Sequence, residues 1–346
     1  MKAAMLQAYN SPLIIEDVKD PETPKNGVTL SVLACGVCRS DWHAWTGADP
    51  DVEAPFILGH EFCGVVEEVG SDCHDWKVGD RVIAPFVLGC GTCPACSSGE
   101  ATTCSTQEVP GFTIPGAFAE MIAVPRADFN LAHLPDGLDP SAAAGLGCRV
   151  TTAFRALVDR GCIRPGEWLA VHGCGGVGLS TIMLGRALGA QIVAVDIMPE
   201  KLELARQLGA HYTVNAAESD AGEAICEITK GGAHVSVEAL GISATFEASI
   251  KSLRPLGRHV QIGMPTGKDE RPELPLNLVY SRQLSLHGTR GMPAHRFPDL
   301  FSLLEASNID PLAMVTQQIT LDQASNALAA LNDYTGAGIA VINRFK

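Results

Sequence analysis

The feature that most constrains the fold is a regular alternation of apolar strand-like runs and helical stretches, which begins near Pro165. The run EWLAVH precedes the helical stretch VGLSTIMLGRALGA, and QIVAVD precedes PEKLELARQLGA. The alternation continues through AHVSVEALG, ATFEASIKSLRP and RHVQIGM. Strands that alternate with helices in this way build βαβ units, so the region predicts an α/β fold with a doubly wound parallel sheet.

A glycine-rich turn, GCGGVG, lies at the first strand-to-helix junction of this region. The pattern is weak alone, but the strand before it, the helix after it and an acid at the end of the next strand give the context of a dinucleotide site. Gly173 would permit the tight turn, Gly175 the close approach of a pyrophosphate, and Gly178 close packing of helix on strand. The predicted cofactor-binding residues of this turn are Gly173, Gly175, Gly176, Val177 and Gly178.

Asp196 ends the second strand-like run, QIVAVD. Its carboxylate would accept hydrogen bonds from both adenosine ribose hydroxyls and would repel a 2′-phosphate, which favours NAD over NADP. Lys201 could reach the same ribose. The alternative is a structural glycine turn followed by an aspartate that caps a helix.

Four cysteines, Cys90, Cys93, Cys96 and Cys104, follow the spacing C-x2-C-x2-C-x7-C. Four thiolates in one short loop can close a tetrahedral shell around Zn²⁺, and a closed shell indicates a structural rather than a catalytic metal. We therefore predict a zinc loop over residues 89–105. The alternatives are an iron–sulfur site or a disulfide cluster.

The rest of the chain has a different sequence pattern, and the overall charge and composition limit the functions that the protein can have. Before residue 149, short β-like runs such as GVTLSVLACG and RVIAPFV predict a mostly antiparallel β domain, and the terminal run GIAVINRF is expected to return to it. The net charge of −14 opposes binding to nucleic acid or to an anionic membrane, and no apolar run reaches membrane-span length. Twelve cysteines without an export signal favour a cytoplasmic location.

Three further segments carry residues that could bind a metal: CRSDWH from residue 38, GHE from residue 59, and LGCRVTT from residue 146. A catalytic zinc needs three protein ligands and one exchangeable position, which Cys38, His60 and Cys148 could provide. Taken singly, His60 is more simply a core histidine and Cys148 a buried thiol.

These segments occur together in a known order. The stretches GVCRSDWH, GHEFCGVVEEVG, VGDRV, GCGTCPACSSGEATTC, LGCRVTTAF, GCGGVG and VAVD resemble the zinc-dependent medium-chain alcohol dehydrogenase family over essentially the whole chain. The resemblance implies a GroES-like catalytic domain, formed by residues 1–148 and 291–346, and a Rossmann NAD-binding domain, formed by residues 149–290. The active site would lie in the cleft between them and use NAD(H) and two zinc ions per chain.

The resemblance also implies roles around the metal. It assigns Cys38, His60 and Cys148 as ligands of the catalytic zinc. Asp41 would orient the imidazole of His60, and Glu61 would be able to approach the metal during ligand exchange.

Beyond the metal, Ser40 would take the alcohol proton and pass it toward His43. Arg39 would pair with the cofactor pyrophosphate, and Thr152 would lie against the nicotinamide. For Ser40, His43 and Arg39 the alternatives are a helix cap, a surface histidine and a solvated charge.

The substrate pocket and one departure are less defined. Trp42, Trp45 and Phe86 could line the pocket, although core packing explains all three equally well. Arg149 stands where many relatives carry a small residue, and it could reach either the cofactor phosphate or an acidic neighbour.

The expected activity is therefore the NAD-dependent interconversion of a primary or secondary alcohol with an aldehyde or ketone. A polyol or other specialised zinc dehydrogenase is the first alternative, although Cys148 as the third ligand argues against a polyol enzyme. A non-catalytic zinc- and dinucleotide-binding scaffold is the second. The expected partner is a small-molecule substrate, and the expected assembly is a homo-oligomer, with a tetramer favoured over a dimer.

Overall fold

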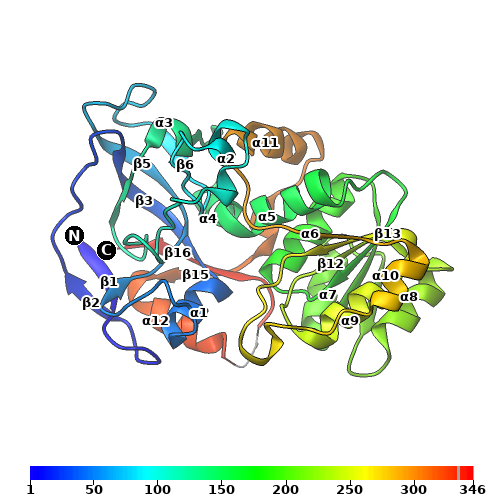
Figure 1. The fold of residues 1–346 in the computed structure, drawn as a ribbon. Helices are drawn as coiled ribbons and strands as arrows, with labels where there is room; N and C mark the ends of the chain where they lie inside the picture. The colour runs from blue at the N-terminus through cyan, green and yellow to red at the C-terminus, as the bar shows by residue number, and fades with distance from the viewer. Residues whose placement is uncertain (333–335, 346) are drawn as a thin grey trace.

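The computed structural model describes residues 1–332 and 336–345. Figure 1 shows β-structure at both ends of an elongated molecule, with the N-terminal strands at one end and the strands coloured green to yellow at the other. The C-terminal strands, coloured orange to red, lie with the N-terminal group. The chain therefore leaves its first unit, builds the second, and returns.

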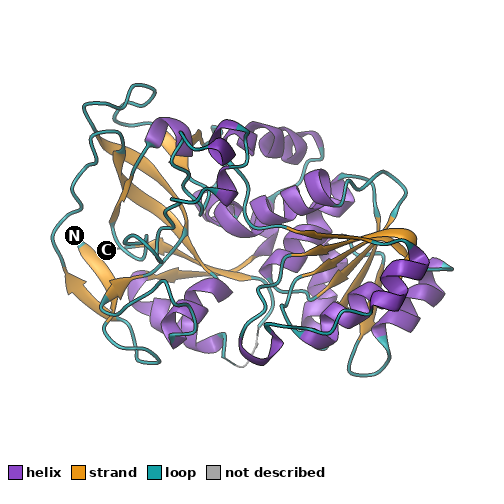
Figure 2. Cartoon of the chain, in the orientation of Figure 1, coloured by secondary structure: helices purple, strands orange, loops and turns teal. Residues whose placement is uncertain are grey.

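The second unit contains a six-stranded sheet in the order β11-β10-β9-β12-β13-β14, in which every neighbouring pair is parallel. Its strands are β9 (Trp168–His172), β10 (Gln191–Asp196), β11 (Tyr212–Asn215), β12 (Ala233–Glu238), β13 (Leu253–Gln261) and β14 (Ser285–Gly288). The helices that pack along it (Figure 2) are α6 (Gly176–Ala187), α7 (Pro199–Leu208), α8 (Ala221–Thr229), α9 (Ser243–Lys251) and α10 (Leu276–Arg282).

Both faces of this sheet are covered. Leu169 and Val171 of β9 share one apolar cluster with Leu179 of α6, whereas Ala170 points into a different cluster with Ile225 of α8. Burial on both faces explains why these strands are continuous apolar runs. The predicted doubly wound parallel sheet is confirmed. Because β10 and β12 flank β9 on opposite sides, the strand order reverses there and opens a crevice at the carboxyl ends of β9 and β12.

The first unit is mostly antiparallel, also as predicted. Its main sheet has the order β15-β16-β3-β5-β6-β8, with β7 paired to β3, and only the β15–β16 pair is parallel. The strands are β3 (Val28–Val37), β5 (Glu61–Val69), β6 (Arg81–Ile83), β7 (Met121–Val124), β8 (Ala132–His133), β15 (Val315–Thr320) and β16 (Ile339–Arg344). A smaller sheet pairs β1 (Lys2–Leu6) with β2 (Ile14–Asp17) and β4 (Phe56–Ile57).

The other α-helices lie outside the sequence of βαβ units. They are α1 (Arg39–Thr46), α2 (Pro94–Ser97), α3 (Ala127–Asn130), α4 (Pro140–Ala144), α5 (Thr151–Arg155), α11 (Phe297–Ala306) and α12 (Ala324–Ala330). Single 3₁₀ turns occur at Ala101–Thr103, Gly267–Asp269, Ala294–Arg296, Pro311–Met314 and Leu321–Gln323. Two π-helical turns, Leu146–Val150 and Ala156–Arg160, flank α5 and make residues 146–160 one continuous helical segment.

The two units are joined by a buried helical segment and by a shared apolar core. The predicted boundary between residues 148 and 149 falls inside the helical segment 146–160, and a single apolar cluster contains Ala34 of β3 as well as Leu169 of β9. The strand expected from GIAVINRF is β16, which pairs with β3. The numerical domain boundaries stay predictions.

Candidate active site and metal centres

A cavity of about 610 Å³ lies between the two units. The first unit contributes Cys38 and His43 to its wall, and the second contributes Gly175 and Gly241, from the loops that follow β9 and β12. The cavity thus occupies the crevice that the sheet order creates, where open α/β sheets bind their ligands.

The glycine turn has the backbone geometry that its sequence predicts. Gly173 has a φ of 98°, in the left-handed region, and a Cβ at Gly178 would lie 1.7 Å from the carbonyl oxygen of Gly173. At Gly175 a Cβ would meet nothing within 4 Å, because this glycine lines the cavity. Gly176 and Val177 open helix α6 on the same wall, so a helix N-terminus is available to a phosphate there.

Asp196 is held rigidly beside this turn. Its Oδ1 accepts hydrogen bonds from the backbone N–H groups of Ile197 (2.8 Å) and Met198 (3.0 Å), and its Oδ2 accepts one from Cys174 (2.8 Å). Each carboxylate oxygen has two lone pairs, so one acceptor position remains, on Oδ2, where the sequence led us to expect two for the ribose. Lys201 lines the cavity.

The second constellation comes together around Cys38, His60, Glu61 and Cys148, whose ligand atoms all lie within 4.8 Å of one another. Cys38 caps helix α1 directly after β3, His60 and Glu61 stand at the start of β5, and Cys148 belongs to the helical segment 146–160. All four side chains are buried. Two thiols, an imidazole and a carboxylate at this spacing form a donor set that suits zinc.

Asp41 orients this cluster. Its Oδ1 lies 2.8 Å from Nδ1 of His60 and accepts a hydrogen bond from the backbone of Gly59, while its Oδ2 accepts one from the backbone of Cys38. The other imidazole nitrogen, Nε2 of His60, is buried and has no hydrogen-bond partner within residues 1–332 and 336–345. A buried nitrogen left without a donor, facing two thiols, fits a metal-binding role.

The surroundings of the two thiols, Cys38 and Cys148, shift their pKa values in opposite directions. The hydrogen bond with Cys148, reinforced by the charge of Arg149, holds the pKa of Cys38 well below its ordinary value, while that same bond raises the pKa of Cys148. The pair therefore favours a thiolate at Cys38, the form that binds metals.

Arg149 contacts an acidic neighbour, one of the two alternatives that the sequence left open. Its Nε lies 2.9 and 2.8 Å from the two carboxylate oxygens of Glu61, and its Nη2 donates to Glu61 and to the carbonyl oxygen of Val37 (2.9 Å). Burial lowers the pKa of Arg149, but the charges of Glu61 and Cys38 and the hydrogen bond to Glu61 together outweigh burial and raise it, so the guanidinium stays charged.

The residues of the expected proton path lie on helix α1. Ser40 places its Oγ 3.9 Å from Sγ of Cys38, and His43 lines the cavity with its Nδ1 buried and unpartnered in the described parts of the chain. Burial, followed by the charge of Arg39, lowers the pKa of His43 from 6.5. Arg39 also lines the cavity, and its guanidinium lies 3.6 Å over the ring of Trp42.

The expected pocket residues occupy different environments. Trp45 donates from its indole nitrogen to the carbonyl oxygen of Ser11 (2.6 Å) and belongs to the core of the first unit, not to the cavity wall. Phe86 makes an edge contact with the His60 ring, at a centroid distance of 5.8 Å. Thr152 is tied by its hydroxyl to the carbonyl oxygen of Cys148 (2.6 Å) and the N–H of Gly291 (3.1 Å).

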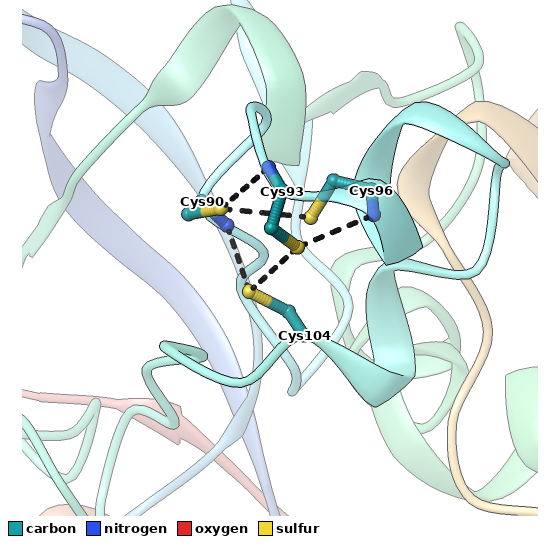
Figure 3. A group of neighbouring side chains, drawn as sticks. All are labelled: Cys90, Cys93, Cys96 and Cys104. Atoms are coloured by element: carbon teal, nitrogen blue, oxygen red, sulfur yellow. Dashed lines mark hydrogen bonds between the residues drawn. The ribbon is translucent and has the colours of Figure 1, made fainter.

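The cysteine quartet is assembled as its spacing predicts (Figure 3). The sulfurs of Cys93 and Cys104 lie 3.7 Å apart and those of Cys90 and Cys96 3.9 Å apart. Four sulfurs at about 2.3 Å from a central zinc, placed at the corners of a tetrahedron, would be about 3.8 Å apart. Hydrogen bonds from the Thr92 hydroxyl and from nearby backbone lower the pKa of Cys90 to about 5. The quartet therefore fits a closed zinc shell.

Sequence reasoning did not find the residue that anchors this loop. Arg155, in the same helical segment as Cys148, is buried and donates to Thr102 and Glu100, between Cys96 and Cys104. No sequence pattern connects these positions, since the contact depends on how the loop folds over the helix.

Comparison with known proteins agrees with this geometry. Residues 24–136 match the family model of the alcohol dehydrogenase GroES-like domain, and residues 176–306 match that of the zinc-binding dehydrogenase. An alcohol dehydrogenase of Geobacillus stearothermophilus is 40% identical over 267 residues, which are 77% of this chain and 78% of the relative. A sorbitol dehydrogenase of Bacillus subtilis is 33% identical over 337 residues, 95% of this chain and 92% of the relative.

The solved structures agree as well. The alcohol dehydrogenase TADH from Thermus sp. ATN1 superposes with a TM-score of 0.91 at 30% identity, over 100% of both chains. The chain therefore belongs to the zinc-type medium-chain alcohol dehydrogenase family, which confirms the resemblance that its sequence carries. Within the described residues, no helix combines the length and apolar character needed to cross a membrane.

Proposed function

We propose that this protein is an NAD-dependent alcohol dehydrogenase that interconverts a primary or secondary alcohol with the corresponding aldehyde or ketone. The observation that carries the proposal is a single cavity lined both by Cys38, of the metal cluster, and by the glycine turn. Hydride transfer requires the substrate carbon and the nicotinamide to be held together in one enclosed space.

In this proposal Cys38, His60 and Cys148 hold the catalytic zinc, and the cysteine quartet holds the structural one. A bound catalytic zinc supplies a Lewis acid that polarises the alcohol oxygen and favours loss of its proton. Asp41 fixes the tautomer and orientation of His60 through the bond to Nδ1.

Some of the proposed cofactor contacts lie on the cavity wall, whereas Thr152 and Asp196 are buried residues outside that wall. The glycine turn and the first N–H groups of α6 bind the pyrophosphate, together with Arg39, and Thr152 stands on the nicotinamide side. Asp196 and Lys201 bind the adenosine ribose. The fixed carboxylate of Asp196 disfavours a 2′-phosphate, which is the basis for proposing NAD rather than NADP.

The proton leaves through helix α1. Ser40, beside Cys38, receives it from the alcohol, and His43 passes it to solvent. The lowered pKa of His43 keeps its ring neutral, and therefore able to accept a proton, at pH 7.

A single variant tests this path. In His43→Gln, alcohol oxidation should slow at neutral pH, and the decline of the wild-type rate below pH 6.5, where His43 becomes protonated, should disappear. The control is His74→Gln, an exposed histidine outside the cavity. Superimposable pH profiles for wild type and His43→Gln would remove His43 from the mechanism.

The activity itself is tested by following NADH absorbance with zinc-replete protein and a panel of primary, secondary, benzylic and polyol alcohols. We expect turnover with at least one monoalcohol class. No turnover with any of them, combined with retained NADH binding, would favour the non-catalytic scaffold.

A polyol dehydrogenase is the second candidate, because the similarity to the Bacillus subtilis sorbitol dehydrogenase extends over 95% of this chain. A thiolate from Cys148 as third ligand argues against it. The same panel decides, since a polyol enzyme would prefer sorbitol-like substrates to monoalcohols.

We further propose a cytoplasmic homo-oligomer, a tetramer rather than a dimer. Strand β14 is an exposed sheet edge, and Leu276, Tyr280 and Leu286 expose apolar surface near it. All twelve cysteines are free thiols, which suits a reducing compartment. Light scattering of the purified protein measures the assembly, and a monomeric mass would contradict it.

A further inference from the structure

Arg149 is a buried arginine with two ends in two different sites. One end holds Glu61, a member of the metal cluster, through Nε, Nη2 and also the backbone N–H of Arg149 (3.1 Å to Oε1). Space for this pair is provided by Gly36, where a Cβ would lie 2.4 Å from Oε2 of Glu61 and 2.9 Å from Nη2 of Arg149.

The other end reaches the glycine turn. A Cβ at Gly176, the first residue of α6, would lie 2.4 Å from Cδ and 3.1 Å from Nη1 of Arg149. Arg149 also lines the cavity, together with Gly175, Gly176 and Val177. The guanidinium therefore packs against the helix start that the proposed function gives to the pyrophosphate.

The hydrogen bonds of Arg149 leave one nitrogen of its guanidinium able to bind a ligand. A guanidinium carries five N–H donors. Nε and Nη2 are engaged by Glu61 and by the carbonyl oxygen of Val37, whereas Nη1 has no hydrogen-bond partner in residues 1–332 and 336–345. Arg149 is only 4% exposed, so donors that are not used by protein have little water to turn to except in the cavity.

Two unused donors on a charged, buried guanidinium beside a helix N-terminus suit an anion with paired oxygens. We propose that Nη1 of Arg149 binds the pyrophosphate of the dinucleotide while Nε and Nη2 hold Glu61 at the metal cluster, so that Arg149 links cofactor occupancy to the metal site. Arg149 touches the cofactor but acts on the metal site only through Glu61, where it is a positioning residue. The inference rests on the proposed function, since it requires a dinucleotide in this cavity.

The proposal predicts the direction in which the charge of Glu61 changes the affinity for the dinucleotide. The carboxylate of Glu61 and the pyrophosphate are two anions that share one guanidinium, so each weakens the hold of the other. Neutralising the carboxylate in Glu61→Gln should therefore strengthen binding of the dinucleotide severalfold. An arginine that served Glu61 alone would leave that affinity unchanged.

The test uses ADP-ribose and adenosine as probes, titrated into the zinc-loaded protein by calorimetry, because neither probe requires turnover. In Arg149→Met, which keeps the length of the chain but no donor, the affinity for ADP-ribose should fall about 10- to 100-fold, the loss expected for one charge-assisted hydrogen bond. The affinity for adenosine, which has no phosphate, should change less than about twofold.

Arg258→Met is the matched control. Arg258 is also partly buried and paired with an acid, Glu167, but Glu167 directly precedes β9, at the end of that strand opposite the glycine turn. Its removal should lower both probe affinities equally or not at all. Zinc content, measured on the same samples by elemental analysis, reports whether Arg149→Met also loosens the metal cluster.

The outcomes separate the inference from the function on which it rests. Wild-type affinity of Arg149→Met for ADP-ribose, or equal losses for ADP-ribose and adenosine, would overturn the role of Arg149 and leave the dehydrogenase proposal intact. Failure of the wild-type protein to bind ADP-ribose or NADH would overturn both.

Discussion

Asp41 is the residue whose replacement should separate the two metal centres most cleanly. It is fully buried, and its two oxygens accept three hydrogen bonds: from His60 (2.8 Å), from the backbone of Gly59 (3.2 Å) and from the backbone of Cys38 (2.8 Å). In Asp41→Asn the amide has one acceptor oxygen, so its NH₂ group must face either Cys38 N–H or the imidazole N–H, donor against donor.

We expect Asp41→Asn to weaken the binding of the catalytic zinc. A hydrogen bond to a charged acceptor contributes about 1.5–3 kcal/mol and a neutral one about 0.5–1.5 kcal/mol. Weakening the bond to His60 and leaving one donor facing another should therefore cost roughly 1.4–2.8 kcal/mol, which equals the 10- to 100-fold loss of metal affinity typical when such a partner of a ligand is altered. We expect the dissociation constant of the catalytic zinc to rise about 10- to 100-fold.

The assay is dialysis against chelators of graded strength, followed by counting zinc per chain. The quartet serves as an internal reference, because Asp41 does not contact it: Asp41→Asn should lose one zinc early and retain the other. Glu53→Gln, which neutralises an exposed acid in the same part of the chain, is the control. Retention of both zincs with wild-type affinity would refute the orienting role assigned to Asp41.

Three further predictions follow from other parts of the structure. Cys96→Ser should leave one zinc per chain and lower the unfolding temperature, because a closed shell of four thiolates tolerates no missing ligand; unchanged metal content would contradict this. Gly178→Ala should abolish NADH binding in a fluorescence titration, since its Cβ would lie 1.7 Å from the carbonyl oxygen of Gly173, and a wild-type affinity would show that the turn has no such constraint. Burial lowers the pKa of His172 to about 3 and of His259 to about 4. The unfolded state then binds more protons below pH 6.5, so the free energy of unfolding should fall between pH 6.5 and 4 by up to about 1.4 kcal/mol per pH unit and histidine, and a flat profile in urea titrations would disprove it.

The local parts of this fold could be predicted because their causes are local. The strands and helices of the second unit follow from apolar periodicity, and the glycine turn and the quartet each lie within a few residues of sequence. The catalytic cluster is different, because Cys38, His60 and Cys148 meet only through the packing of separate segments. Spacing could not bring them together, and the resemblance to a family did.

Two contacts show what single-sequence reasoning cannot resolve. Trp42 and Trp45 are three residues apart on helix α1, both apolar, yet only Trp42 lines the cavity, while Trp45 is buried in the core. The pairing of Arg149 with Glu61 depends on the approach of the helical segment 146–160 to the start of β5. The environments of the two tryptophans and the Arg149–Glu61 pair are both set by tertiary packing, which helix periodicity and residue spacing do not predict.

The antiparallel pairing of β16 with β3, in which Val37 lies opposite Ala340, has a consequence for how the protein is made on the ribosome. During vectorial synthesis β3 emerges long before β16, the strand that covers its edge. Until then β3 presents unsatisfied backbone donors and acceptors of the kind that recruit other chains. The second unit, encoded between the two strands, can fold first as a local module. Nascent chains stalled before residue 339 should therefore depend on chaperones until β16 emerges and closes the sheet.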